Sequence, residues 1–196
     1  MLLNHLTLSK TALVTIDLQR GILLEGQFQP HNNQKVLAAS NEIASALKNT
    51  DALISLVNVN PATIGYLHPF KGRQNEAPNF PADYSDLMMT IADDDTPQNV
   101  IKVTKHNPGA FFGTDLDLQL RRRGIDTVIL TGVVTSNGVY ATALDAFQYG
   151  YKVIVIEDAC TDRDKQLHDI FFKKMIPKIA LVASKNRILT EIKIAD

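Results

Sequence analysis

The sequence predicts an α/β protein of three layers, α/β/α, with helices on both faces of a Rossmann-like, mostly parallel sheet of about six strands. Short apolar, β-branched runs alternate along the chain with amphipathic stretches, which is the pattern of repeated βα units. The length of 196 residues suits one compact domain with a substantial core. No internal repeat or linker divides the chain, so we expect a single domain over residues 1–196.

The elements follow in order from these runs. Six runs rich in Val, Ile, Leu and Ala are predicted strands: residues 12–16, 52–59, 100–104, 127–130, 152–156 and 179–183. Four stretches are predicted helices: residues 32–49, 114–123, 137–149 and 162–176. Gly124 is placed to cap the second helix at its C-terminus, and Gly150 to end the third.

Residues 60–99 break the alternation. They contain five of the eight prolines and few periodic apolar residues. A long irregular segment inside a compact domain is usually a lid, a binding loop or an interface arm. We therefore expect a lid or interface segment here.

Composition excludes several classes of protein. The hydrophobic content of 45%, the charged content of 21% and the net charge of -1 are ordinary for a globular protein. They predict no nucleic-acid partner and no membrane partner. The N-terminus lacks the features of a signal peptide, and the single cysteine, Cys160, rules out an internal disulfide. A cytoplasmic protein is the expectation.

Ligands of open parallel sheets bind outside the carboxyl ends of the strands, so the residues there are candidates for chemistry. Asp17 follows a predicted buried strand, where desolvation would raise its pKa and suit it to proton transfer. A helix cap or a salt bridge is the alternative role. Lys105 closes another strand and would orient Asp17 or stabilise negative charge. Lys102 competes with it, although its position within the strand favours a solvated side chain.

Residues 132–138 form a turn between a strand and a helix, and their backbone N–H groups predict an anion or oxyanion site. The turn has neither the G-x-G-x-x-G spacing of dinucleotide sites nor a G-K-[ST] phosphate loop. Ser136 is a weak candidate nucleophile because it lacks the G-x-S-x-G setting. Cys160 lies after the next strand and is more simply a buried, inert thiol.

In their order along the chain, these segments resemble the isochorismatase-like, or cysteine hydrolase, superfamily over nearly the whole chain. The residues that carry the resemblance are 15–19, Lys105 with 109–116, 124–127, 131–135, 141–147 and 150–159. The resemblance implies a catalytic set of Asp17, Lys105 and the position of the family's cysteine, which is Gly138 in this chain. It also implies a cis peptide between Val133 and Val134, and an oxyanion site lined by the amides of Val134 and Gly138.

Without a thiol at position 138, the amidase route through a covalent thioester is closed. Isochorismatase itself is similar to this chain in lacking that cysteine, and it cleaves a vinyl ether by acid catalysis. The resemblance therefore favours protonation of a small, possibly anionic, metabolite by Asp17, assisted by Lys105. The alternative is a binding or regulatory protein that retains the pocket without the chemistry.

Further expectations concern the ligand and the assembly. Five residues are candidates for substrate binding: Gln19, Asn107, Phe111, Val134 and Thr135. Gln19 and Asn107 would be polar contacts, Phe111 a pocket wall and Val134 an oxyanion donor, and Thr135 would also support the turn. Packing explains Phe111 equally well. No cofactor is expected, and no metal, because the five histidines show no ligand spacing. His68 and His106 are candidate substrate contacts, although a solvated position in a loop is the simpler interpretation of each. The resemblance implies a homodimer or homotetramer.

Overall fold

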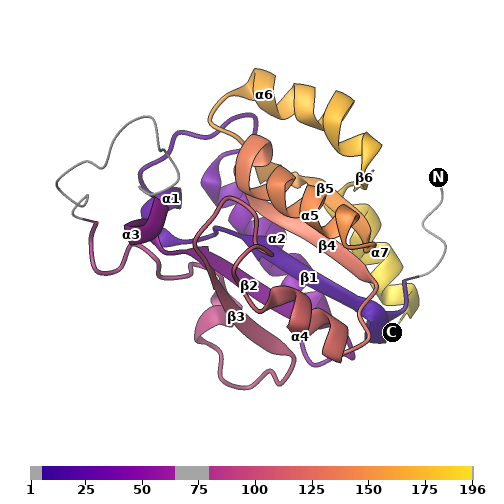
Figure 1. Cartoon of the computed structure of the whole chain (residues 1–196). Helices are drawn as coiled ribbons and strands as arrows, with labels where there is room; N and C mark the ends of the chain where they lie inside the picture. Colours follow the sequence, from indigo (N-terminus) through magenta and orange to yellow (C-terminus); the bar gives the residue numbers. More distant parts are fainter. Residues whose placement is uncertain (1–5, 65–79, 196) are drawn as a thin grey trace.

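The computed structural model describes residues 6–64 and 80–195, and these form a six-stranded parallel sheet with helices on both faces (Figure 1). The strand order is β3-β2-β1-β4-β5-β6. The predicted fold class is confirmed. The strands are β1 (Thr11–Ile16), β2 (Leu53–Val59), β3 (Val100–Lys105), β4 (Thr127–Val133), β5 (Lys152–Thr161) and β6 (Leu181–Ala183).

Two apolar clusters hold the layers together. On one face, Val36, Ile43 and Leu47 of α2 (Asn33–Leu47) and Ile188 and Ile192 of α7 (Lys185–Ala195) pack on the sheet. The opposite face is covered by α4 (Leu116–Arg122) and α5 (Tyr140–Gln148), with α6 (Lys165–Ile170) and the helical turns up to Lys178 following them (Figure 1). The central strands are buried on both sides, which explains their almost unbroken apolar sequences.

Several predicted boundaries are wrong. β4 continues to Val133 and β5 to Thr161, because a register shift after Leu130 lets Gly132 pair with Cys160. The polar residues Glu157 and Asp158, which conceal this extension in the sequence, are not fully buried. Residues 157–160 therefore belong to β5 and do not follow it.

The helices also differ in detail. Asn32 does not begin the first predicted helix but caps α2, accepting a hydrogen bond from the Lys35 amide at 2.8 Å. The predicted helix 162–176 is three consecutive turns of different pitch: α6, a π turn at Phe171–Met175 and a 3-10 turn at Ile176–Lys178. The prediction omitted α7 and two short helices, α1 (Arg20–Leu23) and α3 (Pro61–Ile64).

The strand order reverses between β1 and β4, which are hydrogen-bonded neighbours, with Ile16 opposite Gly132. Such a reversal opens a crevice at the carboxyl ends of the strands, where ligands of doubly wound folds bind. Asp17 and the turn after β4 both lie at this edge. The fold thus brings Asp17 and this turn to the edge of the sheet where the sequence predicts them.

Part of the Pro-rich segment borders the same edge. The amides of Arg20 and Gly21 donate to the carbonyls of Asp86 and Tyr84, at 2.8 and 2.9 Å, so residues 84–88 run beside residues 18–21. Residues 65–79 of that segment, including His68, lie outside the described residues. Within residues 6–64 and 80–195, no helix is long and apolar enough to cross a membrane.

Candidate active site

Asp17 is the first residue after β1, and its backbone is in the left-handed region with φ 55°. This conformation is uncommon outside glycine, although aspartate tolerates it better than most residues. The Asp17 amide donates to the Val57 carbonyl of β2 at 2.9 Å. The turn therefore fixes the carboxylate over the end of the sheet, where only 6% of the residue is exposed.

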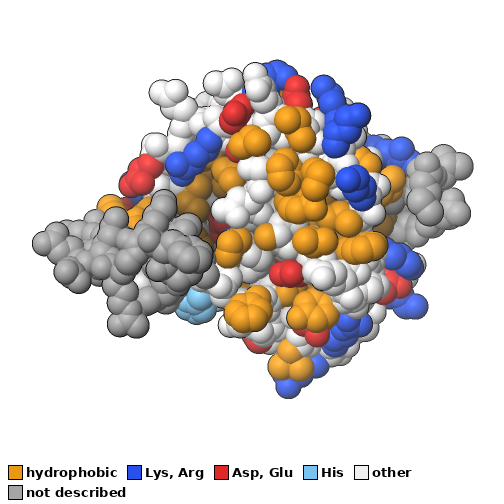
Figure 2. Space-filling model, turned by 45° about the horizontal axis from the view of Figure 1, so that its top comes forward, with side chains coloured by type: hydrophobic (Ala, Val, Ile, Leu, Met, Phe, Trp, Pro, Cys, Tyr) orange, Lys and Arg blue, Asp and Glu red, His pale blue; other side chains and the backbone are white. Residues whose placement is uncertain are grey.

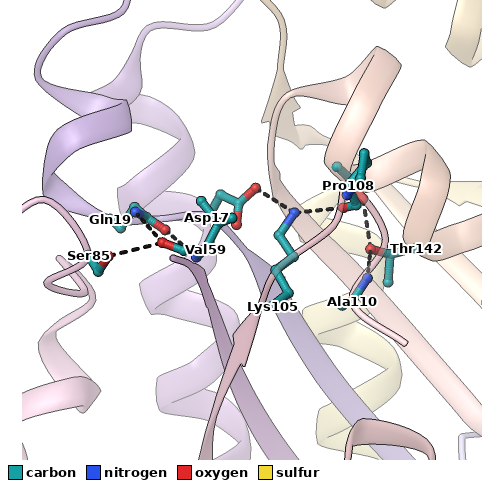
Figure 3. Close-up of polar contacts among 9 residues, drawn as sticks. Asp17, Gln19, Val59, Ser85, Lys105, Pro108, Ala110 and Thr142 are labelled. Carbon is teal, nitrogen blue, oxygen red and sulfur yellow. Dashed lines mark hydrogen bonds and ion pairs between the residues drawn. The ribbon is translucent and has the colours of Figure 1, made fainter. Parts of the chain in front are cut away.

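Lys105 ends β3, and its ammonium group lies 2.8 Å from Asp17 Oδ2 (Figure 3). The same nitrogen donates to the Pro108 carbonyl at 2.6 Å. Lys105 is 2% exposed, whereas the competing candidate Lys102 points to solvent from the same strand. The expected proximity of Asp17 and Lys105 is confirmed.

Burial raises the pKa of Asp17 to about 6, because desolvation outweighs the attraction of Lys105. This agrees with the expectation from its position after a buried strand. A carboxyl group with a pKa near 6 exchanges protons readily at physiological pH. Its second oxygen, Oδ1, is buried and has no hydrogen-bond partner among the described residues.

A cavity of about 420 Å³ opens over this pair. Asp17, Lys105 and Gly138 line it together with Asn107 and Val134. A larger hollow of about 810 Å³ lies at the opposite end of the sheet, around the start of β4 and β5. The charged side chains around that hollow, Lys10, Asp126, Lys152 and Lys178, are not buried. The smaller cavity, with its buried acid and lysine, is therefore the candidate active site.

Gly138 faces the ion pair directly. A Cβ atom at this position would lie 3.1 Å from Asp17 Oδ2 and 3.2 Å from Lys105 Nζ. These distances are tighter than ordinary van der Waals contacts, so a side chain here would require both groups to shift by a few tenths of an ångström. Glycine at 138 therefore leaves the space beside the acid and the lysine open to a ligand.

The turn that carries Gly138 is anchored at both ends. Gly132 has φ 120°, and a Cβ atom there would lie 2.1 Å from the Ile16 carbonyl oxygen, so only glycine fits against β1. The peptide between Val133 and Val134 is cis, as expected from the resemblance. The turn continues as Thr135–Val139 into α5.

Thr142 connects this turn to the loop after Lys105. Its hydroxyl donates to the Gly138 carbonyl at 2.7 Å and accepts from the Ala110 amide at 3.1 Å (Figure 3). One side chain thus holds the positions of Gly138 and of the loop that carries Pro108. The sequence analysis did not identify Thr142, because a threonine one helical turn after a glycine has no distinctive pattern.

Three predicted contacts do not line the cavity. Gln19 is fully buried, and its amide group bonds the backbone: it accepts from Val59 N at 2.7 Å and donates to the carbonyls of Val59 and Tyr84. Phe111 packs in the core against the rings of Tyr149 and Tyr151. Thr135 is buried behind the turn. In each case the side chain is engaged by protein groups.

The supporting role expected for Thr135 has a clear geometry. Its hydroxyl donates to the Thr161 carbonyl at 3.1 Å and lies 2.9 Å from Nδ1 of His168. A hydroxyl carries only one proton, so the imidazole must donate here from a protonated Nδ1. His168 is 1% exposed, and burial lowers its pKa to about 4.

Protonation of His168 is expected to weaken the fold at acidic pH. The folded pKa is below the ordinary value of 6.5, so the unfolded chain binds the proton first and stability is lost as pH falls from 6.5 toward 4. Asparagine at position 168 cannot take up this proton. The free energy of unfolding of wild type, measured relative to that of His168→Asn, should therefore fall by about 2 to 3 kcal/mol between pH 7 and pH 4. Urea titrations of both proteins measure this, and a constant difference would contradict it.

The structure gives no support to the remaining candidates for a nucleophile or a metal site among the described residues. Cys160 is fully buried, and burial raises the pKa of its thiol far above neutral pH, so it is a poor nucleophile. Ser136 lines the cavity, and its amide donates to Asp162 Oδ2 at 2.7 Å. Across the described part of the chain, no three His, Cys, Asp or Glu side chains converge as a metal site would require.

Comparison with known proteins gives a consistent result. The model of the isochorismatase domain family matches residues 11–187. The chain is 36% identical to the uncharacterized isochorismatase family protein YwoC of Bacillus subtilis, over 96% of this chain and 97% of that one. It is 30% identical to a nicotinamidase of Escherichia coli, over 81% and 86% of the two chains.

Among solved structures, an isochorismatase family protein from Burkholderia thailandensis superposes with a TM-score of 0.81 at 32% identity. That alignment covers 97% of this chain and all of the other.

Proposed function

The chain belongs to the isochorismatase domain family, and on that premise we propose that it hydrolyses a small metabolite by acid–base catalysis with Asp17 and Lys105. Gly138 takes the place of the family's nucleophilic cysteine in this proposal. Cleavage of a vinyl ether, as in isochorismatase, is the favoured reaction. The observation that carries the proposal is the buried Asp17–Lys105 pair, whose neighbour Gly138 supplies no thiol.

The proposed reaction begins with protonated Asp17, which donates its proton to the terminal vinyl carbon of the substrate. The adjacent carbon becomes an oxocarbenium ion, and a water molecule adds to it while returning a proton to the Asp17 carboxylate. The resulting hemiketal separates into a ketone and an alcohol, so the net reaction consumes one water. Lys105 keeps the carboxyl group in place and limits the negative charge that it develops after proton transfer.

Other residues have supporting parts. Asn107 and Val134 line the cavity and are the proposed contacts to the substrate. The backbone amides of Val134 and Gly138 are the proposed hydrogen-bond donors to a substrate oxygen. Gln19 instead ties the Asp17 turn to Val59 and Tyr84, so we assign it to positioning. The segment 60–99 is proposed to border the pocket as a lid, supported by the bonds between residues 84–88 and 18–21.

The pH dependence of turnover tests the acid role of Asp17. Because the pKa of Asp17 is about 6 and the reaction needs its protonated form, kcat/KM should fall about tenfold per pH unit above pH 6. Release of pyruvate from isochorismate measures the rate. A rate that rises with pH in this range would contradict the acid role and indicate a base.

A second function is a small-molecule binding or regulatory protein on the same fold. Gly138 favours it, because the family's thiol chemistry is then unnecessary. The buried acid and lysine argue against it, since an ion pair out of water gives little net stability to a pure binder. Stabilisation by small molecules in a thermal shift screen, without turnover of any, would favour the binding protein.

We also propose a homodimer or homotetramer. Figure 2 shows hydrophobic side chains gathered on one face of the molecule. Among the large apolar side chains, Phe147 and Tyr149 at the end of α5 and Leu167 and Ile170 of α6 are 40 to 51% exposed. Exposed apolar patches of this kind commonly mark interfaces. Light scattering after gel filtration should give two or four times the chain mass of 21.7 kDa, and a monomer would contradict the proposal.

A further inference from the structure

Four charged side chains line the cavity: Asp17, Lys105, Asp162 and Arg163. Three of them are already engaged by the protein. Asp17 and Lys105 pair with each other, and Lys105 also binds the Pro108 carbonyl. Whether Asp162 and Arg163 are paired with protein groups determines which charge is left for a ligand.

Asp162 is 2% exposed and is saturated by backbone groups. Its Oδ2 accepts from the Ser136 amide and its Oδ1 from the Arg163 amide, both at 2.7 Å. The first turn after β4 was expected to bind an anion through its amides. A carboxylate of the protein already takes the Ser136 amide, so this donor is not open to a ligand anion, and an opposite charge for that anion must come from a side chain of the cavity.

Arg163 is that side chain. It is exposed, and no carboxylate of the described residues lies within ion-pair distance of its guanidinium. The nearby Lys165, by contrast, pairs with Asp169 at 2.6 Å on α6. Burial raises the pKa of Tyr84, and the charges of Arg163 and Asp17 both act on this tyrosine. The guanidinium and the Asp17 carboxyl group therefore lie near the same side chain.

We propose that Arg163 binds a carboxylate of the substrate, and that the substrate is a compact carboxylic acid whose scissile bond lies over Asp17. This inference rests on the proposed function for the reacting end of the cavity. The volume of about 420 Å³ suits a small metabolite. Guanidinium groups hold carboxylates through two parallel hydrogen bonds, which fixes the orientation of the ligand as well as its affinity.

The test compares ligands that differ only in charge. Acetate, pyruvate and benzoate are titrated against acetamide, pyruvamide and benzamide, with thermal shift and calorimetry as readouts. The proteins are wild type, Arg163→Gln and, as a control that removes a neighbouring cation, Lys165→Gln. We expect at least one carboxylate to bind wild type and Lys165→Gln at least tenfold more tightly than its amide, and Arg163→Gln to lose this preference.

A preference that survives in Arg163→Gln would overturn the proposal, and so would the absence of any carboxylate preference in wild type. The same titrations on Asp17→Asn separate the two proposals, because binding at Arg163 does not need the acid. If Asp17→Asn has lost turnover but still prefers carboxylates to amides, both the catalytic role of Asp17 and the binding role of Arg163 are supported. If Asp17→Asn turns over like wild type while the preference depends on Arg163, only the catalytic proposal fails.

Discussion

Replacing Asp17 by Asn is expected to lower kcat/KM about a thousandfold, and also to destabilise the fold because the buried Lys105 ammonium loses its charged partner. Asparagine has nearly the same shape and can still accept a hydrogen bond from Lys105 in place of the 2.8 Å ion pair. It cannot transfer a proton, and positioned acids contribute about 10² to 10⁴ in rate. The size of the loss therefore reports proton transfer and not a disturbed pocket.

The comparison needs a control for charge alone. Asp51 is an exposed aspartate in the loop before β2, and Asp51→Asn removes one negative charge without touching the cavity. Initial rates of pyruvate release from isochorismate are measured for wild type and both variants at pH 6. A loss smaller than tenfold in Asp17→Asn, with wild-type binding, would show that another group carries the proton.

Replacing Lys105 by Met should destabilise the protein at neutral pH by about 3 kcal/mol or more, as removal of one partner of a buried pair does. Methionine fills much of the same space, so the effect comes from Asp17, which is left with its carboxylate desolvated. The buried Nζ contacts to Asp17 and to the Pro108 carbonyl are both lost. Urea titration at pH 7.5 measures the change in the free energy of unfolding.

The stability lost in Lys105→Met should depend on pH in one direction. Without Lys105 the pKa of Asp17 rises above its present value of about 6, and a raised folded pKa gives stability that is lost as pH increases through it. The deficit of Lys105→Met should therefore shrink between pH 7.5 and 5, where Asp17 becomes neutral. Lys102→Met, on the exposed face of the same strand, should show no such trend; an equal deficit at both pH values in Lys105→Met would contradict the assignment.

The sequence was a reliable guide to the sheet and to the two residues at its edge. Asp17 and Lys105 follow or close apolar runs, and parallel strands carry such positions to one edge irrespective of loop details. Gly138 was located by resemblance to known motifs, since nothing in its own neighbours marks it. The geometry adds that its missing side chain faces Asp17 and Lys105.

The side-chain partners could not be predicted, because they depend on contacts between distant segments. Gln19 was predicted to face the ligand, yet its amide bonds Val59 and Tyr84, 40 and 65 residues away. Asp162 and Arg163 lie within the predicted helix 162–176, because the sequence does not reveal the register shift by which β5 continues to Thr161. The prediction omitted helix α7, although Ile188, Leu189, Ile192 and Ala195 recur at helical spacing and pack on the core.

The measurement that tests the central claim most directly is turnover by the purified wild-type protein of isochorismate and of small amides, followed by intact mass of the protein during the reaction. We predict pyruvate release from the vinyl ether, no amide hydrolysis and no mass added to the chain. Hydrolysis of an amide with a covalent acyl adduct, or failure to release pyruvate while amides are consumed, would contradict thiol-free acid catalysis by Asp17 and Lys105.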